Sequence, residues 1–217
     1  MAATVRPRTG EQAKRHALAQ VREAILRGDM APAQRLVENE LAEQFGVTRA
    51  SIRAALIDLE AQGLVERIRN RGSRVRVVTV EEAVEITECR RALEGLCAAK
   101  AAVAASDEQL ERLGGLGLAM SKAVDAGELV VYSDLDHELH ARIRELSGQR
   151  TARELLNRLN AQLVRHRFQP ALRPGRRPQQ SLKEHLALIE AITARDPQGA
   201  EAAARAHLTS VIEALRD

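Results

Sequence analysis

The stretch from Leu41 to Leu56, LAEQFGVTRASIRAAL, constrains the fold of this chain more than any other. Leu41 and Ala42 begin a short apolar helix face, and Gly46 follows where a helix must end and turn. Thr48 is placed to cap the next helix, because its hydroxyl can accept a hydrogen bond from a free backbone N–H. The stretch therefore predicts two helices joined by a tight turn.

The second of these helices has two distinct faces. Ile52, Ala55 and Leu56 form an apolar stripe at helical spacing. Arg49 and Arg53 are four residues apart, so they share a face away from that stripe. The pattern is typical of a helix-turn-helix, in which the second helix lies in the major groove of DNA. The alternative is an ordinary helical hairpin with solvated arginines.

A change of periodicity after Gly63 favours the first interpretation. Residues 64–69 and 74–78 alternate apolar and polar side chains, which predicts two half-buried strands. The segment 70–73, Asn-Arg-Gly-Ser, suits a tight hairpin between them. A helix-turn-helix followed by such a hairpin is a winged helix. Arg71 and Gly72 at its tip could approach a minor groove.

Residues 18–77 resemble the DNA-binding domain of the GntR family of bacterial transcription regulators. The matching elements are Ile25-Leu-Arg-Gly28, Arg35-Leu36, Leu41-Ala42, Gly46-Val-Thr-Arg49, Ile52-Arg53, Ala55-Leu56, Leu59-Glu60, Gly63-Leu-Val65 and Asn70-Arg-Gly72. The resemblance implies that Arg35, Arg49 and Arg53 contact phosphates and bases, and that Arg71 and Gly72 lie in the minor groove. The residues expected to contact DNA also include Thr48 and Ser51.

The chain departs from the usual GntR pattern at two places. Pro32-Ala33-Gln34 stands where the family usually has Pro-Gly before Arg-Leu. Ser51 and Ala54 stand where the family usually has Pro and Glu around the Val-Arg of the second helix. These departures leave the matching arginines in place, and we expect them to affect which bases the domain recognises.

Composition excludes several other classes of protein. The net charge is only +3, from 33 basic and 30 acidic residues, which fits local contact with DNA better than coating of a polyanion. Phe45, Tyr132 and Phe168 are the only aromatic residues, too few for the stacking platforms that bind single strands or RNA.

Cysteine use and hydropathy predict a cytoplasmic protein. Cys89 and Cys97 lie eight residues apart on one expected helix without a CxxC motif, so we expect no disulfide framework and a reducing compartment. Neither a signal peptide nor an apolar run of membrane-spanning length is present.

The rest of the chain predicts a mainly α protein. A helix is expected at residues 11–27, and no strand pattern occurs after Glu81. Helices are expected there at 81–105, 107–126, 128–147, 150–168, 180–195 and 197–216, with a connector at Pro170–Pro178. We therefore expect a winged helix-turn-helix domain, residues 1–78, followed by a bundle of about six helices, residues 79–217.

Four polar residues fall on apolar faces of the expected bundle helices: Asp136, His140, His185 and His207. A buried carboxylate is costly unless its charge is compensated, and bundle cores build metal sites from side chains on facing helices. We therefore predict a site for zinc, nickel, manganese or iron, although each histidine taken singly favours a core position. His137 lies about 100° round the helix from Asp136 and should face elsewhere. His166 is a candidate neighbour of the same cavity.

Residues 82–216 resemble the FCD domain, the all-helical effector domain of the FadR-like branch of the GntR family. The matching residues are Arg90-Arg-Ala-Leu-Glu94, Asp136-His-Glu-Leu-His140, Glu184-His185 and Ala206-His207-Leu208. The resemblance implies that an Asp and three His, here Asp136, His140, His185 and His207, bind a metal that helps to hold a small organic acid. Arg90 could meet the carboxylate of that effector, or could form an outward salt bridge to Glu94.

Together these features predict a transcriptional regulator, expected to be a repressor. One helix-turn-helix reads few base pairs, so we expect a homodimer on an inverted-repeat operator, controlled by a small carboxylate effector. One alternative is a metal-dependent hydrolase, although its candidate base, Glu138, should point away from the ligands. Another is a DNA-binding protein whose bundle serves only for dimerisation.

Overall fold

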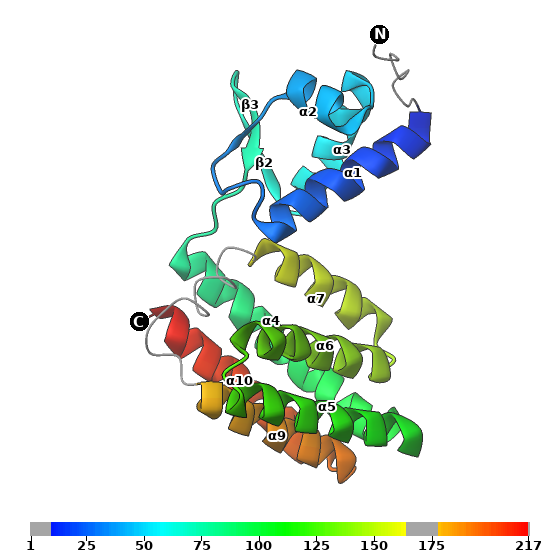
Figure 1. Ribbon diagram of the computed structural model, residues 1–217, viewed down its shortest axis with the longest axis vertical. Coiled ribbons are helices and arrows are strands. Elements are labelled where there is room, and N and C mark those ends of the chain that lie inside the picture. Colours follow the sequence, from blue (N-terminus) through cyan, green and yellow to red (C-terminus); the bar gives the residue numbers. More distant parts are fainter. Residues whose placement is uncertain (1–9, 164–177, 217) are drawn as a thin grey trace. The chain divides into compact units, whose positions relative to one another are not determined.

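The computed structural model describes residues 10–163 and 178–216. The chain divides into two compact units (Figure 1). We call Met1–Val78 with Asn160–Arg165 the winged unit, and Thr79–Leu159 with His166–Asp217 the helical unit. The expected domain division into residues 1–78 and 79–217 stays a prediction. Among the described helices, none is both long and apolar enough to cross a membrane.

The winged unit contains α1 (Gly10–Arg27), α2 (Glu38–Phe45) and α3 (Arg49–Ala61), with a small sheet. The helices bury one apolar stripe each, including Val21 of α1, Leu41 of α2 and Ile52 of α3. The turn between α2 and α3 is the one that the sequence predicts. Gly46 adopts a left-handed conformation (φ 60°), which glycine takes at little steric cost. The Thr48 hydroxyl accepts a hydrogen bond from the Ser51 backbone N–H at 3.2 Å and caps α3.

The sheet of the winged unit differs from the prediction in its details. Its antiparallel strands β1 (Arg35–Leu36), β2 (Val65–Ile68) and β3 (Gly72–Val75) lie in the order β1-β3-β2. Ile68 pairs with Gly72, so the turn is shorter than the predicted 70–73 and β3 begins and ends earlier than 74–78. The reason is that Asn70 itself takes a positive φ of 62°, which reverses the chain within three residues. The sequence did not predict β1.

The helical unit consists of six helices within the described residues: α4 (Val80–Ala104), α5 (Asp107–Asp125), α6 (Leu129–Leu146), α7 (Arg150–Gln162, which ends in the winged unit), α9 (Pro178–Thr193) and α10 (Pro197–Arg216). Thr79 caps α4, and Ser106 forms a capping box with Gln109 at the start of α5. The predicted helix at 150–168 is confirmed to Gln162 only, because its last residues and most of the connector lie outside the described residues. No strand occurs in the described part of this unit.

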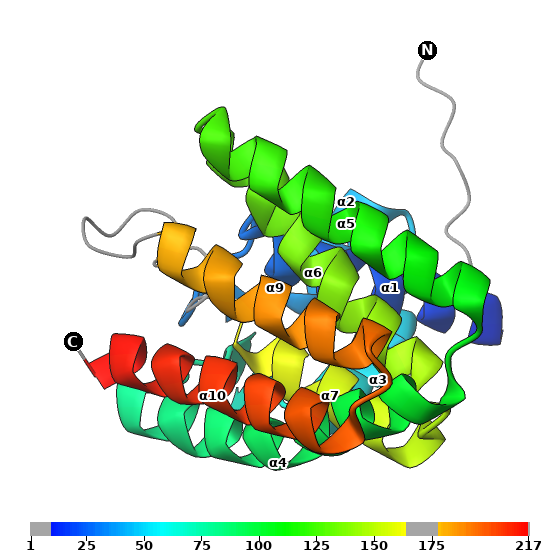
Figure 2. The same cartoon turned by 90° about the horizontal axis from the view of Figure 1, so that it is seen from below.

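The helices of the helical unit pack around one apolar core, to which α4, α5, α6, α7, α9 and α10 all contribute side chains. Helices α4 and α10 run side by side, α9 lies next to α10, and α5 lies next to α9 (Figure 2). Helix α6 packs against α4 and α5. Gly95 allows the close approach of α4 to α10, since a Cβ there would come within 3.1 Å of the Arg205 side chain. The core of the unit includes Met120, Leu139, Leu156 and Leu188, all almost completely buried.

Candidate metal centre and DNA-contacting surface

Three helices bring the four predicted metal ligands together. Asp136 and His140 lie one turn apart on α6, His185 lies on α9 and His207 on α10. One ligand atom from each residue lies within 4.8 Å of those of the other three. The ring centroids of the three imidazoles are 4.4–5.4 Å apart. His185 is completely buried and His207 nearly so, whereas the side chains of His140 and Asp136 are partly exposed.

Two atoms at the centre of this cluster lack ordinary partners. Asp136 Oδ1 lies 2.9 Å from His185 Nε2 and 3.5 Å from His140 Nε2. Asp136 Oδ1 and His185 Nε2 are nevertheless buried without a hydrogen bond among the described residues. Unsatisfied buried polar atoms are costly and therefore rare. Atoms that share a metal ion at about 2.1 Å lie at most about 4.2 Å apart, so a small closing movement would let all four ligands reach one ion.

The other nitrogen of each imidazole has a protein partner. His140 Nδ1 lies 2.9 Å from Glu94 Oε2, and His207 Nδ1 lies 2.9 Å from Glu184 Oε2. His185 Nδ1 lies 2.9 Å from the Tyr132 hydroxyl. A proton held on Nδ1 leaves the Nε2 lone pair for a metal, and such partners orient the histidines of metal sites.

The charges in the cluster favour a bound cation. Burial raises the pKa of Asp136, but the imidazoles of His140 and His185 outweigh it and hold that pKa well below its usual range. Burial, together with the neighbouring imidazoles, lowers the pKa of His207 to about 4. Burial also opposes a charge on His140, but Glu94 and Asp136 outweigh it and raise its pKa to about 9. The cluster thus combines an ionised carboxylate with a neutral imidazole, and a metal would replace the His140 proton.

The remaining histidines lie outside the cluster. His137 is exposed, and its Nδ1 lies 2.6 Å from the Ser133 carbonyl oxygen. His16 lies on α1 of the winged unit. His166, considered from the sequence as a neighbour of the cavity, lies outside the described residues.

Arg90 forms a salt bridge to Glu94, but the bridge faces inward. Its Nε and Nη2 donate to Glu94 Oε1 at 3.0 and 2.8 Å, and the Glu94 side chain is only 5% exposed. The predicted salt bridge to Glu94 is therefore present, although it does not face outward, and the effector contact of Arg90 stays a prediction. Helix α4 packs against α6, so Glu94 joins Arg90 to His140.

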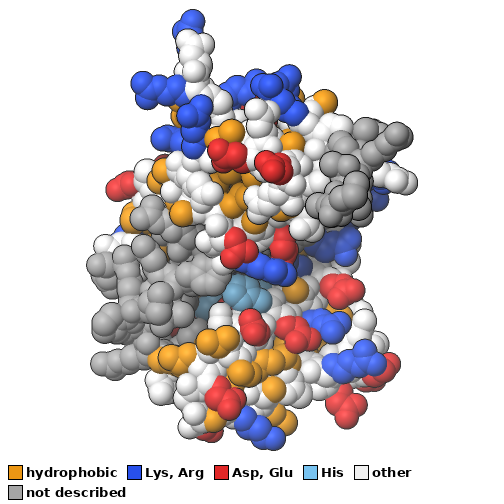
Figure 3. Space-filling view, turned by 45° about the horizontal axis from the view of Figure 1, so that its top comes forward, with side chains coloured by type: hydrophobic (Ala, Val, Ile, Leu, Met, Phe, Trp, Pro, Cys, Tyr) orange, Lys and Arg blue, Asp and Glu red, His pale blue; other side chains and the backbone are white. Residues whose placement is uncertain are grey.

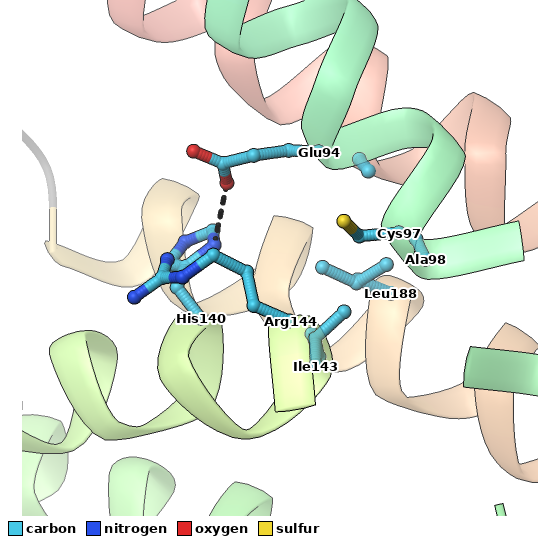
Figure 4. A pocket seen from close by; sticks show the side chains of 8 residues that line it. Glu94, Cys97, Ala98, His140, Ile143, Arg144 and Leu188 are labelled. Atoms are coloured by element: carbon cyan, nitrogen blue, oxygen red, sulfur yellow. Dashed lines mark ion pairs between the residues drawn. The ribbon is translucent and has the colours of Figure 1, made fainter. Parts of the chain in front are cut away.

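A second arginine lies beside the cluster. Glu94, Cys97, His140 and Arg144 line a small cavity of about 10 Å³ (Figure 4). Burial lowers the pKa of Arg144, and no described residue forms a hydrogen bond or ion pair with its guanidinium group. The sequence analysis missed Arg144, although its position four residues after His140 places it on the same face of α6 as Asp136 and His140.

The outer face of α3 carries the predicted arginine pair. Arg49 and Arg53 are both exposed, and both contact Glu38, the first residue of α2. Arg49 Nε donates to Glu38 Oε2 at 2.8 Å. Arg53 donates through Nε to Oε1 at 3.0 Å and through Nη2 to Oε2 at 2.7 Å. Hydrogen bonds from both arginines lower the pKa of Glu38 to about 2. The sequence reasoning missed this carboxylate, since it lies 11 and 15 residues away.

The other predicted DNA contacts occupy different environments. Arg35, Arg71 and Gly72 are exposed, and Lys and Arg side chains gather at the end of the winged unit that carries the hairpin tip (Figure 3). Thr48 is half-buried and caps α3. Ser51 is buried, and its hydroxyl lies 2.9 Å from that of Thr48. In the free chain Ser51 therefore supports the start of α3 and does not present its hydroxyl to solvent.

Comparison with known families agrees with both units. Residues 13–75 match the family described as bacterial regulatory proteins, gntR family. Residues 85–210, more than half of the chain, match the FCD domain.

Relatives and solved structures extend along most of the chain. It is 27% identical over 197 residues to the HTH-type transcriptional repressor RspR of Escherichia coli, covering 88% of this chain and 86% of that protein. It is 27% identical over 216 residues to the HTH-type transcriptional regulator LutR of Bacillus subtilis, covering 88% and 95%. The fold is similar to that of McbR/YncC from E. coli, with a TM-score of 0.75 at 19% identity and coverage of 94% and 96%.

The domain matches and the relatives also decide between the functional classes considered above. The relatives are transcriptional regulators, which removes the metal-dependent hydrolase as an interpretation. This chain belongs to the GntR family of bacterial transcriptional regulators, with a winged helix-turn-helix domain and an FCD domain.

Proposed function

We propose that this regulator is a cytoplasmic repressor that binds an inverted-repeat operator as a homodimer, and that a small carboxylate effector at a divalent metal centre controls its affinity for DNA. The observation that carries the effector control is the convergence of Asp136, His140, His185 and His207, with two buried polar atoms that form no hydrogen bond among the described residues. The names of relatives such as the repressor RspR support the direction of control.

Asp136, His140, His185 and His207 would hold the metal through one carboxylate oxygen and three imidazole nitrogens. This donor set suits zinc, nickel, manganese or iron. An octahedral ion would keep two further positions, where it could polarise and hold the carboxylate of an effector. Glu94, Tyr132 and Glu184 would fix the orientation of the imidazoles.

Arg144 is better placed than Arg90 to meet the negative charge of the effector. Arg90 already donates two hydrogen bonds to Glu94. Arg144 lines the cavity beside His140 and has no partner of its own among the described residues. A partly buried guanidinium group pairs strongly with a carboxylate, often through two parallel hydrogen bonds. The proposed effector is therefore a small organic acid with a carboxylate that Arg144 and the metal share.

The homodimer follows from how a helix-turn-helix reads DNA. One copy contacts only a few base pairs, and two copies related by a two-fold axis read an inverted repeat. Control requires that the effector binds the DNA-competent and DNA-incompetent arrangements of the dimer with different affinity. The alternative, in which the bundle serves only for dimerisation, predicts no response to any acid.

The test is selection from random duplex DNA by the purified protein with Zn²⁺ present, followed by sequencing. Enrichment of a short inverted repeat is the expected result, and Arg49→Ala with Arg53→Ala should abolish it. A panel of small organic acids is then titrated into the complex with the enriched duplex. If no motif were enriched even at low salt, that result would contradict operator binding. If no acid in the panel released the protein from its operator, that result would contradict the effector control. It would favour the alternative in which the bundle serves only for dimerisation.

A further inference from the structure

The carboxylate of Glu38 joins the two arginines that the DNA-contacting surface depends on. It receives one hydrogen bond from Arg49 and two from Arg53, at 2.7–3.0 Å. Glu38 belongs to α2 and the two arginines to α3, so the contact fixes side chains of one helix from the other. The Glu38 side chain is only 26% exposed, whereas those of Arg49 and Arg53 are 60% and 53% exposed.

The contact leaves the outer ends of both guanidinium groups unused. A guanidinium group has five N–H donors in a fixed fork. Arg49 uses only Nε on Glu38, and Arg53 uses Nε and one hydrogen of Nη2. The edge formed by Nη1 and Nη2 stays open in each residue, and an arginine can use that edge for bidentate contact with guanine O6 and N7.

We propose that Glu38 is a specificity-determining residue, which braces Arg49 and Arg53 as a fixed pair and so favours base contacts over contacts with any phosphate. The inference rests on the proposed binding of DNA by this unit. Bracing reduces the side-chain entropy that each arginine loses when it binds a base. The carboxylate also offsets part of the positive charge, which weakens the sequence-independent attraction to phosphates.

The same contact has a competing explanation, in which Glu38 masks the two arginines from DNA. If Glu38 merely competes with DNA for the arginines, its removal would strengthen binding to every duplex by the same factor. If Glu38 braces the arginines, its removal would strengthen non-specific binding and weaken discrimination between sequences. The ratio of affinities for a selected and a scrambled duplex therefore separates the two explanations.

The experiment compares the wild type with Glu38→Gln and a matched control, Glu40→Gln. Glu40 lies on the same helix and is exposed, and no described residue pairs with its side chain, so both variants lose one negative charge but only one frees the arginines. Each protein selects from the same random duplex library. Each then binds the duplex enriched by the wild type, and a scrambled version of it, at two salt concentrations.

We expect Glu38→Gln to enrich a broader motif and to lower the ratio of selected to scrambled affinity by about three- to tenfold, part of what one bidentate arginine–guanine pair contributes. Glu40→Gln should leave the ratio unchanged. A ratio unchanged in Glu38→Gln, or lowered equally in Glu40→Gln, would overturn the inference. Glu38→Asp keeps the charge but shortens the side chain, and it should lower the ratio without strengthening binding to the scrambled duplex. If the wild type itself enriched no motif, that result would contradict the proposed function, and the inference about Glu38 would fall with it.

Discussion

Glu184 illustrates how a residue outside the proposed set of metal ligands can orient one of its imidazoles. Its Oε2 lies 2.9 Å from His207 Nδ1, and Gln180 donates a hydrogen bond to its other oxygen at 3.1 Å. Burial raises the pKa of Glu184, but the hydrogen bonds from His207 and Gln180 outweigh it and lower that pKa. An ionised Glu184 keeps the His207 proton on Nδ1, so Nε2 is the nitrogen that faces the cluster.

Replacing Glu184 by Ala should therefore weaken metal binding while all four ligands remain. Loss of such a partner typically lowers metal affinity by about 10- to 100-fold. Titration with Zn²⁺ in competition with a chromophoric chelator measures this change. Glu190→Ala is the matched control, since Glu190 is an exposed carboxylate on the same helix. Equal Zn²⁺ affinity in the two variants would contradict the assigned role of Glu184.

The convergence of Asp136, His140, His185 and His207 could be predicted from sequence, because each stands out as a polar residue on an apolar helix face. Their partners could not. Glu94 follows Arg90 by four residues, so in sequence it resembles half of a surface ion pair. Only the packing of α4 against α6 brings it to His140. Arg144, by contrast, follows His140 by four residues on the face that carries Asp136, so the helical spacing that indicates the cluster indicates Arg144 as well.

At the scale of elements, local signals set most helix boundaries. The predicted helix at 197–216 is the observed α10, and the predicted 107–126 differs from α5 by one residue. Capping residues and glycines act within one turn, so they can be recognised in the sequence. Strand β1 was missed because its two residues are ordered by pairing with β3, almost 40 positions away, and such long-range pairing leaves no local pattern.

The ion pairs of Glu38 should link α2 to α3 in a pH-dependent way. The pKa of Glu38 is lowered from 4.5 to about 2, so its stabilisation is complete above about pH 4.5 and is lost as pH falls through 2. Because the arginines are half exposed, the free energy of unfolding at pH 6 should fall by only about 1 kcal/mol in Glu38→Gln. Urea unfolding followed by circular dichroism from pH 6 down to pH 2 measures this difference. A difference that stayed constant over that range would show that it does not come from the ionised carboxylate.

At the scale of the whole molecule, the winged and helical units each have their own apolar core. The core of the winged unit includes Ile52 and Leu59, and that of the helical unit includes Leu139 and Leu188. The proposed control of DNA binding therefore requires that a change at the candidate metal centre is transmitted to the winged unit. Thermodynamic linkage makes such coupling reciprocal, so an acid that weakens operator binding must itself bind less tightly in the presence of the operator.

Metal removal tests this coupling directly. With Zn²⁺ bound, an acid identified in the panel should weaken binding to the selected duplex by about 5- to 150-fold, the usual range of allosteric coupling. Fluorescence anisotropy of the labelled duplex measures the affinity. Stripping the metal with a chelator should abolish the effect of the acid, and added Zn²⁺ should restore it. His185→Ala should behave like the stripped protein, whereas His137→Ala, which changes an exposed histidine outside the cluster, should respond like the wild type. An acid response that persisted in His185→Ala would locate the effector away from this centre, because His185 is the completely buried member of the proposed ligand set.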